Sequence, residues 1–248
     1  MNVTGLVGLG FIILAAICMV VFAILQRRFS FTFRRISAFA SIQRNVRLLV
    51  EAGSRLHFSL GNGNMLAPDG ASALAGLVLL RRLGEITSPG DLAPIATTGN
   101  GVLNLLAQDT LRTAHAAASV QQPFDMNNAR VTGFTPFAYA ASVMTIIGAE
   151  NISSNVLIGN FGPEVGLLTE AASRQNASCI AASESLTAQA VLYASSPETL
   201  VGEELFAAGA YAQAGSFHDA SLLLQDLLRW LIVIALLAGA GLKLAGLL

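Results

Sequence analysis

Two long apolar runs lie at the ends of the chain. The first, Val3–Leu25, contains no charge and no proline. The second extends from about residue 227 to residue 248, and its only charges are Arg229 and Lys243, whose long side chains can reach the membrane interfaces. At 1.5 Å per helical residue, either run is long enough to cross a hydrocarbon core of about 30 Å. The pattern therefore predicts two transmembrane helices.

Between these runs, short segments typical of buried strands alternate with helical stretches rich in alanine and leucine. Strands are expected at residues 56–60, 94–97, 130–134, 155–159, 178–182 and 189–193. Helices are expected at residues 70–83, 101–117, 136–149, 163–175 and 197–212. Such alternation is typical of a parallel sheet covered by helices. The predicted fold class is α/β, a mostly parallel, Rossmann-like sheet domain flanked by N- and C-terminal transmembrane helices.

These elements divide the chain into a first span, a basic juxtamembrane collar with a helix, a cytoplasmic α/β domain, and a long helix that continues into the second span. The four segments are residues 1–26, 27–55, 56–215 and 216–248. Ser216 and Asp219 are expected to start the last helix as a capping box. In the collar, the alternating aromatic stretch from Phe29 to Phe33 suits either an interfacial segment or a bent continuation of the first helix.

The composition fits a membrane protein. Of 248 residues, 54% are hydrophobic and only 12% are charged, against about 25% charged in typical soluble chains. The mean hydropathy is +0.62. A net charge of −1 disfavours nucleic-acid binding, and two cysteines cannot crosslink a fold of this size.

Charge is distributed unevenly along the chain. Residues 26–55 hold seven arginines and one acid, a net charge of +6, whereas residues 56–226 hold fourteen acids and five arginines, a net charge of −9. By the positive-inside rule, the basic collar and the α/β domain lie in the cytoplasm and both termini lie outside. We expect anionic headgroups of the bilayer to contact side chains at the membrane interface. These side chains are Arg27, Arg28, Arg34, Arg35, Arg229 and Trp230.

Three glycine–asparagine turns follow predicted strands, each where the chain passes into a helix. In open α/β sheets ligands bind at this carboxyl edge, because glycine allows close backbone approach and helix N-termini attract anions. The candidate ligand-binding residues are Gly61, Asn62, Gly99, Asn100, Gly159, Asn160 and Gly162. This uncharged set suits a polar or singly anionic ligand better than a triphosphate. Arg130 is the nearest candidate cation if its strand neighbours these turns, and the sequence does not establish the strand order. Glycine and asparagine are also favoured in ordinary tight turns, which is the alternative interpretation.

No catalytic set stands out in the sequence, and no cofactor is specified. None of the three histidines has a partner at ligand spacing, so no metal site is expected. They are His57, His115 and His218. Cys179 is interpreted as a small core residue. Glu164 and Glu184 follow predicted strands and could place a carboxylate at the ligand edge, although acids are also common at helix starts.

Small residues recur at packing distances in both apolar runs. They are Gly5, Gly8, Gly10, Ala235, Gly239, Gly241 and Ala245. Such rows allow helices to approach closely, within one chain or between chains. The main hypothesis is therefore a membrane-anchored, self-associating structural or scaffold protein that forms a homo-oligomer. The alternative is a nucleotide- or small-anion-binding enzyme or sensor that uses the glycine–asparagine turns.

The whole layout resembles uncharacterised bacterial membrane proteins that are grouped as a domain of unknown function. The features that carry the resemblance are the N-terminal span, the arginine collar, the α/β domain with its glycine–asparagine turns, and the C-terminal span. The resemblance covers most of the chain and implies a location in the bacterial cytoplasmic (inner) membrane. It implies no activity.

Overall fold

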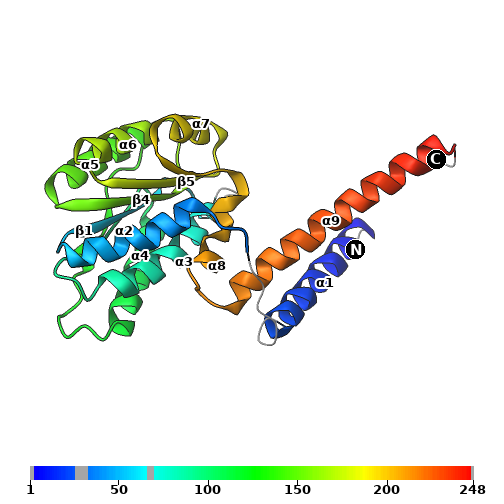
Figure 1. The fold of residues 1–248 in the computed structure, drawn as a ribbon, viewed down its shortest axis with the longest axis horizontal. Coiled ribbons are helices and arrows are strands. Elements are labelled where there is room, and N and C mark those ends of the chain that lie inside the picture. The colour runs from blue at the N-terminus through cyan, green and yellow to red at the C-terminus, as the bar shows by residue number, and fades with distance from the viewer. Residues whose placement is uncertain (1–2, 26–32, 66–69, 247–248) are drawn as a thin grey trace. The chain divides into compact units, whose positions relative to one another are not determined.

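A computed structural model describes residues 3–25, 33–65 and 70–246. The chain divides into two compact units, which are residues 34–212 on the one hand and residues 1–33 with residues 213–248 on the other. The first unit is an α/β domain built on a six-stranded parallel sheet (Figure 1). The predicted fold class, an α/β sheet domain with apolar helices at both ends of the chain, is confirmed.

The sheet has the strand order β3-β2-β1-β4-β5-β6, and all its strand pairs are parallel. The strands are β1 (Arg55–Gly61), β2 (Ile95–Thr98), β3 (Ala129–Val131), β4 (Ile152–Asn160), β5 (Ser178–Ser183) and β6 (Glu198–Leu200). The chain builds outward from β1 in one direction through β2 and β3, and then in the other direction from β4 to β6. This is the strand order of dinucleotide-binding Rossmann domains, and it creates a topological switch point between β1 and β4.

Helices cover both faces of the sheet (Figure 1). On one face, α2 (Ser37–Glu51), α3 (Gly70–Thr87) and α4 (Gly101–Ala117) pack on the strands, and α8 (Ala208–Tyr211) packs against α3. On the other face lie α5 (Pro136–Ala149), α6 (Val165–Arg174) and α7 (Leu186–Ser195). Two 3-10 helices, Met126–Asn128 and Gly202–Ala207, complete the domain.

The core consists of apolar side chains from both faces of the central strands. Along β1, Leu56, Phe58 and Leu60 are fully buried. On the α5–α7 face, Leu157 of β4 and Phe161 belong to a buried cluster with side chains from all three helices. Parallel strands have continuously hydrophobic sequences because both of their faces are buried.

Two sequence predictions near the end of the domain are wrong. Residues 189–193 are not a strand but part of α7, in which Ala188 and Leu192 are buried at helical spacing of four. Residues 197–212 do not form one helix, because Glu198–Leu200 pairs in parallel with Ile180–Ala182 of β5 and a 3-10 helix and α8 follow. Pro197, the first residue of the predicted helix, therefore precedes an edge strand.

The second unit contains α1 (Val3–Leu25) and α9 (Ser216–Leu244), which pack against each other. Both are long and apolar enough to cross a membrane, with lengths of about 34 Å and about 43 Å at 1.5 Å per residue. Helix α9 begins at Ser216 as predicted, but the capping box is wrong. Gly215 occupies the N-cap position, and no side chain caps the helix. Ser216 is one residue past the N-cap, so its hydroxyl is not placed to accept from the first N–H groups of the helix.

Candidate functional site

The three glycine–asparagine turns lie side by side at the carboxyl edge of the sheet. They follow β1, β2 and β4, which are adjacent in the order β2-β1-β4. The Gly99 N–H donates to the Gly61 carbonyl at 2.9 Å, and the Asn62 N–H donates to the Asn160 carbonyl at 3.0 Å. The turns therefore form one bonded cluster at the topological switch point, the place where open α/β sheets bind ligands.

Glycine is required at two positions of this cluster. Gly61 has φ +71°, and a Cβ at this position would overlap the Asn160 carbonyl. Gly99 has no unusual φ, but a Cβ there would overlap Oδ1 of Asn62. The Asn62 side chain thus occupies the space that a side chain at position 99 would fill, and the two residues are mutually dependent.

The Asn62 carboxamide is buried and unsatisfied. Among the described residues, neither its Oδ1 nor its Nδ2 has a hydrogen-bond partner, although both atoms are buried. Two more polar atoms are buried without a partner among the described residues. They are the Thr132 hydroxyl, just beyond β3, and Oδ1 of Asn104, in the first turn of α4. More than nine in ten buried polar groups in native proteins are hydrogen-bonded, so unsatisfied groups near a switch point mark a place for a water or a ligand.

Two helix starts beside the cluster are already occupied by the protein's own oxygen atoms. Oδ1 of Asn100 accepts from the N–H groups of Val102 (2.9 Å) and Leu103 (3.3 Å) and so caps α4. At the start of α6, the buried carboxylate of Glu164 accepts from the Gly162 N–H at 2.8 Å. These amides are where an anion would bind, and a carboxylate beside them repels another negative charge.

The remaining predicted residues of the β4 turn join this turn to β5. Gly159 and Asn160 are the last residues of β4, and Asn160 is half-buried. The following Phe161 is buried, and its N–H donates to the Ser183 hydroxyl at 3.2 Å. The turn is thereby fixed to the end of the neighbouring strand.

A buried polar network lies at the centre of the sheet and was not predicted from the sequence. Nδ1 of His57 lies 2.5 Å from Oδ1 of Asn155, and Nε2 lies 2.9 Å from the Thr97 hydroxyl. The Tyr139 hydroxyl, from α5, contacts the Thr97 hydroxyl at 3.1 Å and also bonds the Ser59 hydroxyl. The signal was present in β1, where the polar residues His57 and Ser59 alternate with leucine and phenylalanine, so they share the face toward α5.

Burial shifts both ionisable groups of this network toward their neutral forms. Desolvation lowers the pKa of His57 to about 4, against the hydrogen bond that Oδ1 of Asn155 accepts from the ring, which raises it. Desolvation likewise raises the pKa of Tyr139 to about 12. At neutral pH the network is therefore uncharged, and it consists of hydroxyl, amide and imidazole hydrogen bonds.

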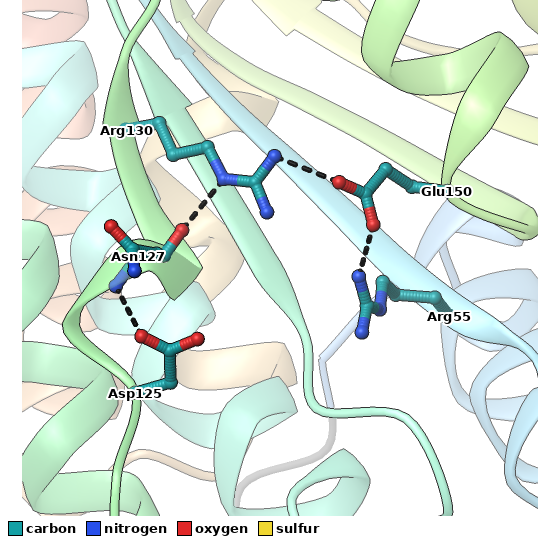
Figure 2. Close-up of polar contacts among 5 residues, drawn as sticks. All are labelled: Arg55, Asp125, Asn127, Arg130 and Glu150. Atoms are coloured by element: carbon teal, nitrogen blue, oxygen red, sulfur yellow. Dashed lines mark hydrogen bonds and ion pairs between the residues drawn. The ribbon is translucent and has the colours of Figure 1, made fainter.

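Arg130 does not face the glycine–asparagine turns. Its Nη1 bonds Glu150 at 2.8 Å and its Nε donates to the Asn127 carbonyl at 2.7 Å (Figure 2). Glu150, the C-cap of α5, also bonds Arg55 at the start of β1. Figure 2 shows the carboxylate between the two guanidinium groups. The proposed role of Arg130 as a ligand cation is thus wrong, because its charge is used in this ion cluster.

The predicted interface residues fall in different places. Arg27 and Arg28 lie outside the described residues, as does most of the Phe29 to Phe33 stretch. Arg34 and Arg35 are exposed, and Arg34 forms an ion pair with Glu204. On α9, Trp230 is 67% exposed and Arg229 lies 3.4 Å from Asp226.

The other candidate side chains are dispersed. In the part of the chain that the structure describes, no three His, Cys, Asp or Glu side chains are close enough to hold a metal ion. Nε2 of His115 contacts the Gln122 carbonyl at 2.7 Å, far along the chain from His57. Cys179 is buried in β5, and burial raises the pKa of its thiol to about 11, so the thiol is unreactive in the folded domain.

The fold and the site together define an α/β protein with a Rossmann-type strand order, a glycine–asparagine cluster at its switch point, and two terminal helices able to cross a membrane. A family model for a domain of unknown function, DUF6754, matches residues 3–247. The chain belongs to this family. No curated protein and no solved structure matches it.

Proposed function

We propose that this chain is a membrane-anchored binding protein whose α/β domain holds a small, uncharged polar ligand at the switch point. The observation that carries the proposal is the buried carboxamide of Asn62, which has no hydrogen-bond partner among the described residues. It offers one acceptor and two donors, and leaving them unsatisfied costs about 1–3 kcal/mol per group. A ligand with a complementary edge would recover this free energy.

The chemistry of the surroundings favours an uncharged ligand over a phosphate. The amides at the starts of α4 and α6 are bonded to Asn100 and Glu164, and Arg130 is bonded to Glu150. Residues 56–226 contain no lysine and carry a net charge of −9. A nucleoside, a polyol or a primary amide matches the carboxamide of Asn62, whereas a triphosphate would meet no free cation in the described part of the site.

The anchoring part of the proposal follows the charge pattern. We place the α/β domain in the cytoplasm and both termini outside a bacterial inner membrane, because the seven arginines of residues 26–55 follow the first apolar helix directly. The domain would then sample cytoplasmic metabolites while it stays attached to the bilayer.

The test is a ligand screen on the full chain in mild detergent. Adenosine, uridine and myo-inositol are compared with ATP, and unfolding of the domain is followed by dye labelling of Cys179 in a Cys18→Ser background. A ligand at a hundred times its Kd stabilises by about 2.7 kcal/mol, enough to raise the midpoint by several degrees. We expect at least one uncharged compound to raise the midpoint in the wild type and in the control Gln121→Ala, but not in Asn62→Ala. The proposal fails if ATP stabilises most, if no compound stabilises, or if Asn62→Ala responds like the wild type.

A second candidate function, self-association as a scaffold, is favoured by the glycines of the terminal helices. A Cβ at Gly5, Gly8, Gly10, Gly239 or Gly241 would meet no atom within 4 Å among the described residues. The contact between α1 and α9 therefore does not use these glycines, and they are free to admit a helix of a second copy.

The mass of the particle in mild detergent tests this second candidate. Self-association predicts a multiple of 25.8 kDa after correction for bound detergent. The Gly239→Leu variant should reduce the mass to that of one chain, whereas the control Leu237→Ile should not. A wild-type monomer would exclude the scaffold function and leave the ligand-binding proposal intact.

A further inference from the structure

Helix α2 has one face in the core and one face in solvent. Its buried residues include Phe39, Ile42, Val46 and Leu49, which pack toward the sheet. The opposite face is exposed and borders a shallow surface hollow. The residues along this exposed stripe of α2 are Ala40, Gln43, Arg44, Arg47, Leu48 and Glu51.

The arginines of the stripe differ from those in the rest of the domain. Every arginine from Arg55 to Arg174 forms an ion pair with an acidic side chain. By contrast, Arg44 donates only to the Ser41 hydroxyl at 3.2 Å, and Arg47 has no polar partner in the described part of the chain. Glu51, four residues after Arg47, forms no ion pair with it in the structure. Two exposed guanidinium groups one turn apart are thus available to an external anion.

We propose that the exposed stripe of α2 binds the anionic headgroups of the bilayer to which the chain is anchored. Two features favour lipid as the partner: the charge of Arg44 and Arg47, and the neighbouring Leu48, whose side chain is 56% exposed and can enter the headgroup region. The inference rests on the proposed membrane anchoring.

The chain itself keeps α2 close to a membrane. Ser37 follows Leu25, the last residue of α1, by twelve positions. Such a segment spans at most about 40 Å even when fully extended. The local concentration of headgroups around α2 is therefore high, and two arginines suffice where a free domain would need more. Residues 56–212 of the domain hold twelve acids and five arginines, and their net charge of −7 repels the rest of the domain from the same surface, so docking through α2 has a defined orientation.

The experiment uses the full chain in lipid nanodiscs. A fluorophore on Ala40→Cys, in a Cys18→Ser background, reports contact through quenching by spin-labelled headgroups. A second label on Tyr193→Cys, an exposed position on α7 at the other face of the sheet, is the positional control. Discs of phosphatidylcholine alone are compared with discs that contain 30% phosphatidylglycerol.

We expect phosphatidylglycerol to increase quenching at position 40 but not at position 193, and 0.5 M NaCl to remove the increase. The double variant Arg44→Gln/Arg47→Gln should lower the ratio of docked to undocked domain by about thirty-fold. This factor corresponds to about 1 kcal/mol of attraction to the anionic surface for each arginine. The variant Arg112→Gln removes an exposed arginine that is paired with Asp109 and should leave quenching unchanged. Equal quenching in both lipids, or an unchanged signal in the double variant, would overturn the inference. Failure of the chain to enter the discs would refute the anchoring instead.

Discussion

The ion cluster at the amino edge of the sheet gives the sharpest prediction for stability. The substitution Glu150→Gln keeps the shape of the side chain and removes its charge. It leaves Arg55 and Arg130 without an acidic partner among the described residues. Nε of Arg55 is already buried and has no partner among the residues that the structure describes, so this guanidinium depends on Glu150.

The size of the effect follows from the exposure of the three side chains. Arg55, Glu150 and Arg130 are 17%, 27% and 33% exposed. Breaking a fully buried ion pair costs about 3–5 kcal/mol, whereas a surface pair contributes about 0–1 kcal/mol. A cluster at this intermediate exposure should contribute about 2 kcal/mol. For a domain of this size, that corresponds to a fall in the unfolding midpoint of about 4–8 °C.

The assay must report the domain rather than the two apolar terminal helices. The one tryptophan, Trp230, lies in α9, so its fluorescence does not follow the sheet. Cys179 is buried in β5, and in a Cys18→Ser background its labelling by a thiol dye reports opening of the domain. The matched control is Glu170→Gln, which breaks the pair with Arg174, where the side chains are 55% and 71% exposed.

We expect Glu170→Gln to shift the midpoint by no more than about 1–2 °C. If Glu150→Gln shifts it no further than this control, burial does not strengthen the cluster and the reasoning is refuted.

The pKa of His57 is about 4 in the folded domain and 6.5 in the unfolded chain, so the unfolded chain binds more protons between these pH values. The free energy of unfolding should therefore fall by about 2 kcal/mol from pH 7 to pH 5. Thermal unfolding of His57→Gln should show a smaller fall over the same pH range. The substitution Gly99→Ala should cost about 1–3 kcal/mol because its Cβ overlaps Asn62 Oδ1, and adding Asn62→Ala should restore most of the loss; additive effects in this cycle would contradict the contact. For topology, Asn2→Cys should be labelled from outside intact cells and Tyr193→Cys only after permeabilisation, and external labelling at position 193 would exclude a cytoplasmic domain.

Helix boundaries were predictable where local signals determine them. Helices α4 and α5 match the predicted ranges 101–117 and 136–149 at both ends. Asn100 at the N-cap of α4 and Pro136 at the first position of α5 act within one turn, so the sequence alone contains their effect. The prediction of a helix at residues 197–212 was wrong because the strand in this segment depends on pairing with β5. No local signal in the sequence encodes that contact.

The candidate site was predictable as a set of turns but not as an arrangement. The rule that ligands bind at the carboxyl edge of parallel strands identified the turns after β1, β2 and β4. Their adjacency follows from the strand order, which only long-range pairing determines. For the same reason, the bonding of Arg130 to Glu150 could not be read from the chain, because it depends on where α5 ends relative to β3.

Polar side chains lie at the start of β1, in its middle and directly after its last residue, and comparing them identifies where the proposed ligand would gain most. Arg55 at the start is ion-paired with Glu150 through Nη1, and its Nε is buried without a partner among the described residues. His57 and Ser59 in the middle are hydrogen-bonded within the network that includes Tyr139. Only directly after the strand, at Asn62, does a carboxamide have both of its polar atoms buried and unpaired in the described part of the chain. Because satisfied groups gain little from a new partner and an unsatisfied buried group gains the full hydrogen bond, the ligand that we propose would gain most of its binding free energy at Asn62.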